Sequence, residues 1–232
     1  MRLAVAIYPL VFAIYLLLVL PVLSAVRHQR ERARGASGEP RAKARFLRAT
    51  LFRQIVNIVL FCVLWLLIGV PAARLGLGAP TSWWLAGGLA VAAFGFLTVT
   101  AVLQRAKAAE IRTLAEERAS ALIPKSTEER RLWAGLCIAG GVFEELAYRG
   151  FLFYYLRVVI PHIDTLETVV LSSAFFGLAH IYQGRRGVLS TGVAGLVLGG
   201  LYALSGNLFA PIVAHVMANL RLLLILPPEE TT

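Results

Sequence analysis

The stretch LAVAIYPLVFAIYLLLVLPVLSAV, residues 3–26, decides the class of fold because it contains no charged residue. At a rise of about 1.5 Å per residue, a helix of this length crosses the ~30 Å hydrocarbon layer of a bilayer. The apolar run is longer than the core of a cleaved signal peptide, and only Arg2 precedes it as a basic residue. We interpret it as a retained transmembrane helix.

The rest of the chain has the same apolar character. Of its 232 residues, 58% are hydrophobic and 16% are charged, with a mean hydropathy of +0.73, whereas soluble domains are typically about one quarter charged. Further apolar spans are predicted at about 50–70, 83–103, 132–160, 166–182, 188–205 and 208–226. The sequence therefore predicts an all-α, polytopic membrane bundle of about seven transmembrane helices.

The predicted bundle is a single unit with two parts, followed by a short tail. Residues 1–131 supply three helices and basic loops, residues 132–226 carry the polar motifs, and 227–232 form a polar tail. Ser126-Thr-Glu-Glu has the pattern of a capping box that starts the fourth helix. Gly192, Gly195 and Gly199 give the sixth span a face of small residues, which is typical of close helix packing in membranes.

The basic residues predict how the chain is oriented. The net charge is +10, and most Lys and Arg lie in the expected loops 27–48, 104–131 and 183–187. Seven spans with the N-terminus outside place all three loops, and the C-terminus, in the cytoplasm, as the positive-inside rule requires. We expect a protein of the cell (inner or plasma) membrane whose basic residues contact membrane lipid, and no nucleic-acid partner.

The fourth span contains charges that need an explanation, because a charge within the bilayer costs about 2.5–3.5 kcal/mol on insertion scales. Glu145 and Arg149 are four residues apart and share a helix face, so they predict an internal ion pair that braces the bundle. Glu144 points about 100° away from Glu145 and has only Tyr148 one turn further on. An acidic residue without a cationic partner in its own helix suits a general base.

Two further polar pairs occur at helical spacing. Phe176 and His180 share a face of the fifth span, and His215 and Asn219 share a face of the seventh. Each histidine alone is compatible with a hydrogen-bonded residue of a polar interior. Together with Glu144 they predict a cavity between the fourth, fifth and seventh helices that holds a base, a partner to position water, and donors for an oxyanion.

The three motifs resemble those of the CPBP intramembrane proteases, which include type II CAAX prenyl endopeptidases and bacterial Abi proteins. They are Glu144-Glu-Leu-Ala-Tyr-Arg149, Phe176-Gly-Leu-Ala-His180 and His215-Val-Met-Ala-Asn219. The resemblance covers about residues 130–226. It implies an intramembrane endopeptidase acting on peptides or lipidated proteins, with a prenylated CAAX protein as the default substrate.

The resemblance also implies a role for each motif residue. Glu144 with His180 would activate the attacking water, and His215 with Asn219 would stabilise the oxyanion. Glu145 and Arg149 would brace the site, and Phe176 would form a packing wall beside it.

The family has been described both as glutamate-dependent and as metal-dependent. The chain lacks the His-Glu-x-x-His helix that usually supplies zinc ligands. We favour a mechanism without a cofactor, although zinc held by Glu144, His180 and His215 is the alternative.

Two other functions fit parts of the sequence. A non-catalytic membrane partner or immunity-type protein would keep the fold, but such a scaffold has no need of the unpaired Glu144. A small proton-coupled transporter would use Glu144 and the histidines as a relay. The odd number of spans and the absence of a detectable internal repeat disfavour the transporter.

Overall fold

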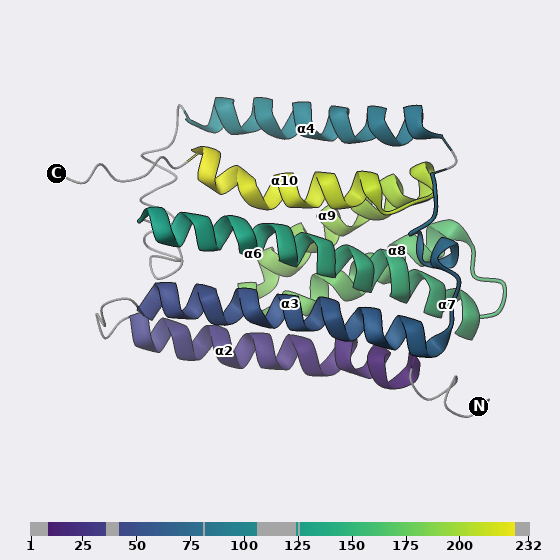
Figure 1. The fold of residues 1–232 in the computed structure, drawn as a ribbon, viewed down its shortest axis with the longest axis horizontal. Helices are drawn as coiled ribbons and strands as arrows, with labels where there is room; N and C mark the ends of the chain where they lie inside the picture. Colours follow the sequence, from purple (N-terminus) through teal and green to yellow (C-terminus); the bar gives the residue numbers. More distant parts are fainter. Residues whose placement is uncertain (1–8, 36–41, 81, 106–123, 125, 226–232) are drawn as a thin grey trace.

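The computed structural model describes residues 9–35, 42–80, 82–105, 124 and 126–225. These residues form helices joined by short turns and contain no strand, and the helices lie side by side in one bundle (Figure 1). The predicted all-α membrane bundle is thus confirmed. Three helical segments are long and apolar enough to cross a bilayer by themselves, namely Pro9–Arg27, Lys43–Ile68 and Ile181–Ser205.

The first three predicted spans are each a continuous helical segment. The first is helical from Pro9 and passes through a π-helical turn, η1 (Tyr15–Val19), into α2 (Leu20–Gly35). The second is α3 (Ala42–Ile68), which a 3-10 turn, η2 (Ala72–Leu75), separates from α4 (Trp83–Arg105).

The prediction of a loop at residues 27–48 is wrong for the residues that the structure describes. These are helical, because α2 continues to Gly35 and α3 already begins at Ala42. Ala, Arg, Lys and Gln are good helix formers, so both helices extend beyond the apolar run. Residues 36–41, and most of the charged segment 104–131, lie outside the described residues.

The fourth span consists of three helical pieces rather than one. The α-helix α6 (Thr127–Glu145) begins at the predicted capping box of Ser126 and ends at the π-helical segment η3 (Leu146–Leu152), and α7 (Phe153–Val159) follows. π-Helical turns are rare and are often found at functional sites. Here the π-helix follows directly after the paired glutamates.

The last three spans are α8 (Thr165–Ala179), α9 (Gly184–Ser205) and α10 (Phe209–Ile225). The glycine face of α9 packs closely on α8, as predicted: a Cβ at Gly195 would lie 3.0 Å from Ser173 Cβ, and one at Gly199 would lie 3.1 Å from Val169 Cγ1. On α8, a Cβ at Gly177 would lie 2.8 Å from the Val188 carbonyl oxygen of α9. Small residues therefore bring these two helices together.

The core lies around η3 and the outer faces are apolar. Phe143, Tyr148 and Leu152 are almost fully buried, whereas Trp84 is 92% exposed and Leu66 is 72% exposed. In water such exposed apolar side chains would be unfavourable, but lipid is their natural solvent. The packing thus agrees with a protein of the membrane.

The helix ends that flank the basic segments lie together. Figure 1 shows that α2 ends, α3 begins, α4 ends and α6 begins at the same end of the bundle. At this end Arg48 pairs with Glu128, and Lys43 Nζ lies 3.7 Å from Glu129 Oε2. The arrangement matches the alternating up-and-down path on which the predicted orientation depends.

Candidate active site

Three helices bring one carboxylate and two imidazoles together. Glu144 lies near the end of α6, His180 caps the end of α8, and His215 lies within α10. Glu144 Oε2 is 3.9 Å from His180 Nε2 and 3.6 Å from His215 Nε2. The predicted convergence of the fourth, fifth and seventh spans at these residues is therefore present.

Each imidazole is oriented by an acceptor at its other nitrogen. His180 Nδ1 lies 2.8 Å from the carbonyl oxygen of Phe176, and His215 Nδ1 lies 2.7 Å from Glu145 Oε1. A carbonyl and a carboxylate only accept hydrogen bonds, so each Nδ1 carries the hydrogen. In the neutral rings, both Nε2 lone pairs then face the carboxylate of Glu144.

The predicted ion pair of Glu145 and Arg149 is present and completely buried. Arg149 donates to Glu145 Oε1 at 2.9 Å and to the carbonyl oxygen of Gly195 at 2.9 Å, and its guanidinium lies 4.6 Å from the centre of the Phe176 ring. Oε1 of Glu145 therefore accepts hydrogen bonds from both Arg149 and His215. The sequence predicted the bracing pair but not its direct contact with a site histidine.

Phe176 packs against both imidazoles. It is 2% exposed, and its ring centre lies 4.9 Å from that of His180, 5.7 Å from that of His215 and 5.1 Å from that of Tyr148. The ring thus keeps both imidazoles in place and covers the buried guanidinium of Arg149.

Asn219 is the site residue that the structure does not bring into contact with the others. It is half-buried on α10, one turn beyond His215, and its amide has no hydrogen-bond partner among the described residues. The shared oxyanion role of His215 and Asn219 stays a prediction.

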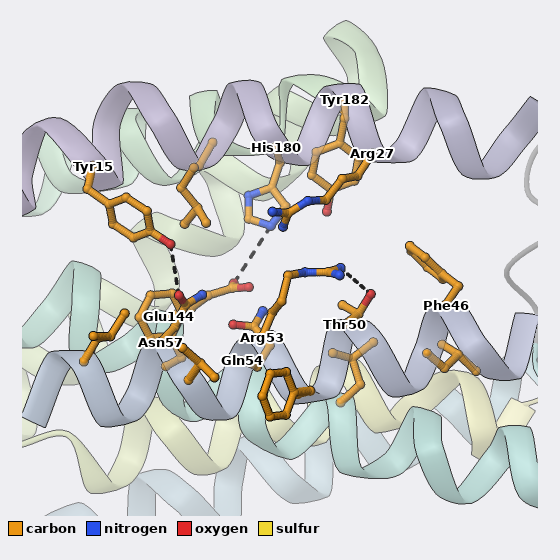
Figure 2. Close-up of a pocket in the computed structure, with 18 of the residues that line it drawn as sticks. Tyr15, Arg27, Phe46, Thr50, Arg53, Gln54, Asn57, Glu144, His180 and Tyr182 are labelled. Carbon is orange, nitrogen blue, oxygen red and sulfur yellow. Dashed lines mark hydrogen bonds and ion pairs between the residues drawn. The ribbon is translucent and has the colours of Figure 1, made fainter.

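The predicted position of the cavity, between the fourth, fifth and seventh helices, is wrong in part. A cavity of about 510 Å³ lies beside Glu144, and its walls come mainly from α2, α3 and α6, with His180 at the end of α8 and no described residue of α10. In Figure 2, Glu144 and His180 point toward each other across part of this space, and Arg53, Gln54 and Asn57 enter it from α3. Tyr15 donates a hydrogen bond to Asn57 Oδ1 at 2.9 Å across it.

The polar side of α3 was not recognised in the sequence, although a signal is present. Thr50, Arg53, Gln54 and Asn57 recur at helical spacing within an otherwise apolar span. Polar residues inside a predicted span usually face a bundle interior or a cavity. The first span contributes Tyr15 and Arg27 to the same cavity.

The donor types at the site fit zinc, but the arrangement is not that of a ready metal centre. Two imidazole nitrogens and one carboxylate oxygen are ordinary zinc ligands, and an acceptor at each Nδ1 is the usual second-sphere partner. Among the described residues, however, no group of three His, Cys, Asp or Glu side chains has the geometry to hold a metal ion.

Comparison with known families gives one finding. Residues 128–221 match the family model described as "Type II CAAX prenyl endopeptidase Rce1-like". This segment contains all three motifs, from Glu144 to Asn219. No match to a curated protein or to a solved structure was found.

Proposed function

We propose that the chain is an intramembrane endopeptidase that hydrolyses peptide bonds of membrane-associated substrates, because residues 128–221 match the type II CAAX prenyl endopeptidase model. The observation that carries the proposal is the position of Glu144, whose Oε2 faces the Nε2 atoms of both His180 and His215. The cavity beside it gives a peptide and a water molecule room to meet within an apolar bundle.

Glu144 and His180 activate the water in this proposal. The carboxylate of Glu144 removes a proton as the water oxygen attacks the carbonyl carbon of the scissile bond, and His180 Nε2 accepts a hydrogen bond that orients the same water. When the tetrahedral intermediate collapses, protonated Glu144 returns the proton to the leaving amine. The peptide bond is thereby exchanged for a carboxylate and an amine.

His215 stabilises the oxyanion as an imidazolium. Because its Nδ1–H is engaged by Glu145, its Nε2 carries a hydrogen only when the ring is positively charged. Glu144 Oε2 lies 3.6 Å from this Nε2, and Glu145 Oε1 lies 2.7 Å from Nδ1. Asn219 supplies the second donor, which requires its amide to turn toward the substrate on binding.

Arg149 and Glu145 position His215 rather than take part in the chemistry. Arg149 is fixed by two hydrogen bonds and by the Phe176 ring, and it fixes Glu145 in turn. The imidazole of His215 therefore has one orientation before the substrate arrives, which lowers the reorganisation needed in the transition state.

A zinc-dependent mechanism is the alternative that uses the same residues. Glu144, His180 and His215 would hold the ion, which would supply Lewis-acid polarisation of the carbonyl. We favour the metal-free account, in which Glu144 remains available as the base. Elemental analysis of the purified protein decides between them.

We propose that the substrate reaches the site from the end of the bundle that carries the basic segments. This end is the cytoplasmic one if the positive-inside rule orients the chain. The family match makes a peptide or lipidated protein with a prenylated CAAX terminus the first substrate to test.

The test is hydrolysis by the purified full chain in detergent and in liposomes. Quenched fluorescent peptides are offered with and without a lipid group, and Glu144→Gln is compared with Glu128→Gln, whose carboxylate lies on the exposed part of α6. Cleavage by the wild type and by Glu128→Gln, but not by Glu144→Gln, supports the proposal. A folded wild type that cleaves none of the peptides contradicts it and favours a non-catalytic partner, and proton-driven uptake without cleavage favours a transporter.

A further inference from the structure

Three polar atoms around the cavity lack a hydrogen-bond partner in the part of the chain that the structure describes. The side-chain atoms Gln54 Oε1, Trp133 Nε1 and Tyr148 Oη are all buried, and none has a hydrogen-bond partner among the described residues. All three residues line the same cavity as Glu144. A buried polar group without a partner costs free energy, so water or a ligand must satisfy these atoms.

The three atoms lie at successive heights along the axis of α6, in the order Trp133, Gln54 and Tyr148, and we call them the row. Trp133, Gly140 and Glu144 are seven and four residues apart and so share one face of the helix. The Gln54 amide reaches this face from α3, since a Cβ at Gly140 would lie 3.7 Å from Gln54 Nε2. Tyr148 follows Glu144 in the chain and is only 1% exposed. The row therefore leads from the basic end of the bundle to the candidate base.

The chemistry of the row matches amide groups. Gln54 Oε1 accepts a hydrogen bond, the indole N–H of Trp133 donates one, and the Tyr148 hydroxyl can do either. None of these three groups is charged, and most of the other lining residues are apolar, although Arg27, Arg53 and Glu144 also line the cavity. A peptide backbone offers neutral N–H and C=O groups in alternation, whereas a lipid chain would leave all three atoms unpaired.

The length of the row also matches an extended peptide. From Trp133 to Glu144 the helix rises by about 16 Å at ~1.5 Å per residue. An extended chain advances about 3.3 Å per residue, so about five residues span this distance. From Gly140, which marks the height of Gln54, to Glu144 the corresponding length is about two residues of extended chain.

We propose that Gln54 and Trp133 form a backbone track that binds an extended segment of the substrate along α6. The proposal rests on the peptidase function proposed above and names how that site holds its substrate. Gln54 accepts from a backbone N–H about two residues from the scissile bond, and Trp133 donates to a backbone carbonyl about three residues further out. A track of this kind binds the main chain and so leaves the side-chain sequence of the substrate largely free.

The test is a scan of backbone esters. A fluorescein-labelled decapeptide of alanine, valine and leucine is compared with analogues in which one amide at a time is replaced by an ester, which removes the N–H and weakens the carbonyl as an acceptor. Binding is measured by fluorescence anisotropy on Glu144→Gln protein, so that no peptide is cleaved. Gln54→Leu and Trp133→Phe are added to this background, with Gln29→Leu and Trp84→Phe as matched controls outside the cavity.

The expected result is a pattern with two sensitive positions about three residues apart. At each, the ester raises Kd about fivefold to tenfold, the loss expected for one hydrogen bond. Gln54→Leu removes the sensitivity at one position and Trp133→Phe at the other, whereas the controls leave both. A flat ester profile, a profile that neither variant changes, or no peptide binding overturns the proposal.

The same experiment separates the track from the catalytic proposal. If the ester pattern appears but wild-type protein does not hydrolyse the parent peptide or its lipidated form, the track is supported and the proposed peptidase function fails. If the wild type hydrolyses the peptide but the ester profile is flat, the track fails and the peptidase function stands.

Discussion

Neutralising one partner of the Glu145–Arg149 pair should destabilise the protein strongly, because both side chains are 0% exposed. Glu145→Gln and Arg149→Met keep most of the side-chain volume and remove one charge each. The charge that remains is buried without its partner, which typically costs about 3–5 kcal/mol.

The structure ranks the two variants. In Arg149→Met, Glu145 keeps a hydrogen bond from His215 Nδ1 at 2.7 Å, and this imidazole can take up a proton. In Glu145→Gln, Arg149 keeps its contacts with the Gly195 carbonyl and the Phe176 ring but loses its carboxylate partner. We therefore expect about 3 kcal/mol for Arg149→Met and about 5 kcal/mol for Glu145→Gln. The double variant leaves neither charge and should lose less than the sum.

Thermal unfolding in detergent measures these differences. At about 2–4 °C per kcal/mol for a chain of this size, Arg149→Met should lower Tm by about 6–12 °C and Glu145→Gln by about 10–20 °C. Arg186→Met, on the exposed start of α9, is the control and should change Tm little. Single variants that melt like the wild type, or a double variant that loses the full sum, would refute the buried-charge argument.

Three further outcomes are expected. Glu144→Gln should reduce the rate of hydrolysis at least about 100-fold without lowering Tm, because only the base is lost, and a purified variant with near-wild-type turnover would contradict that role. Asn219→Ala should lower kcat, by a loss of about 2.7–4 kcal/mol of transition-state stabilisation, and should change KM little. The loss in the double variant with His215→Ala should be smaller than the sum of the two single losses. About one zinc ion per chain that disappears with His215→Ala would instead make His215 a metal ligand. A cysteine at Ala36, which lies outside the described residues, should react only from the cytoplasmic side of intact cells; labelling from outside would reverse the orientation.

The sequence by itself determined the membrane class and the helices. Apolar runs long enough to cross a bilayer fix where the helices lie, because hydrocarbon admits no unpaired backbone polar group. The spacing of Glu145 and Arg149 predicted their ion pair, and the glycines of α9 predicted a close helix contact, whose partner the structure identifies as α8. Local features of this kind depend on 3.6 residues per turn and need no knowledge of the neighbouring helices.

The positions of the helix ends were harder to predict from the sequence, and the reason is also local. Basic segments on either side of residue 36 look like loops by composition, yet α2 and α3 continue into them because Arg, Lys and Ala support helices outside the bilayer. The π-helix η3 leaves no signature in the residue pattern, since it differs from an α-helix only in which carbonyl each N–H meets.

Only the tertiary structure decided which polar residues share a space. The motifs predicted that Glu144, His180 and His215 converge, but the hydrogen bond from His215 to Glu145 depends on how α10 lies against α6. The cavity of Gln54 and Trp133 likewise arises where α3 lies alongside α6. Helical spacing gives the direction of a side chain within its own helix, whereas the rotation and depth of the facing helix follow from packing over the whole bundle.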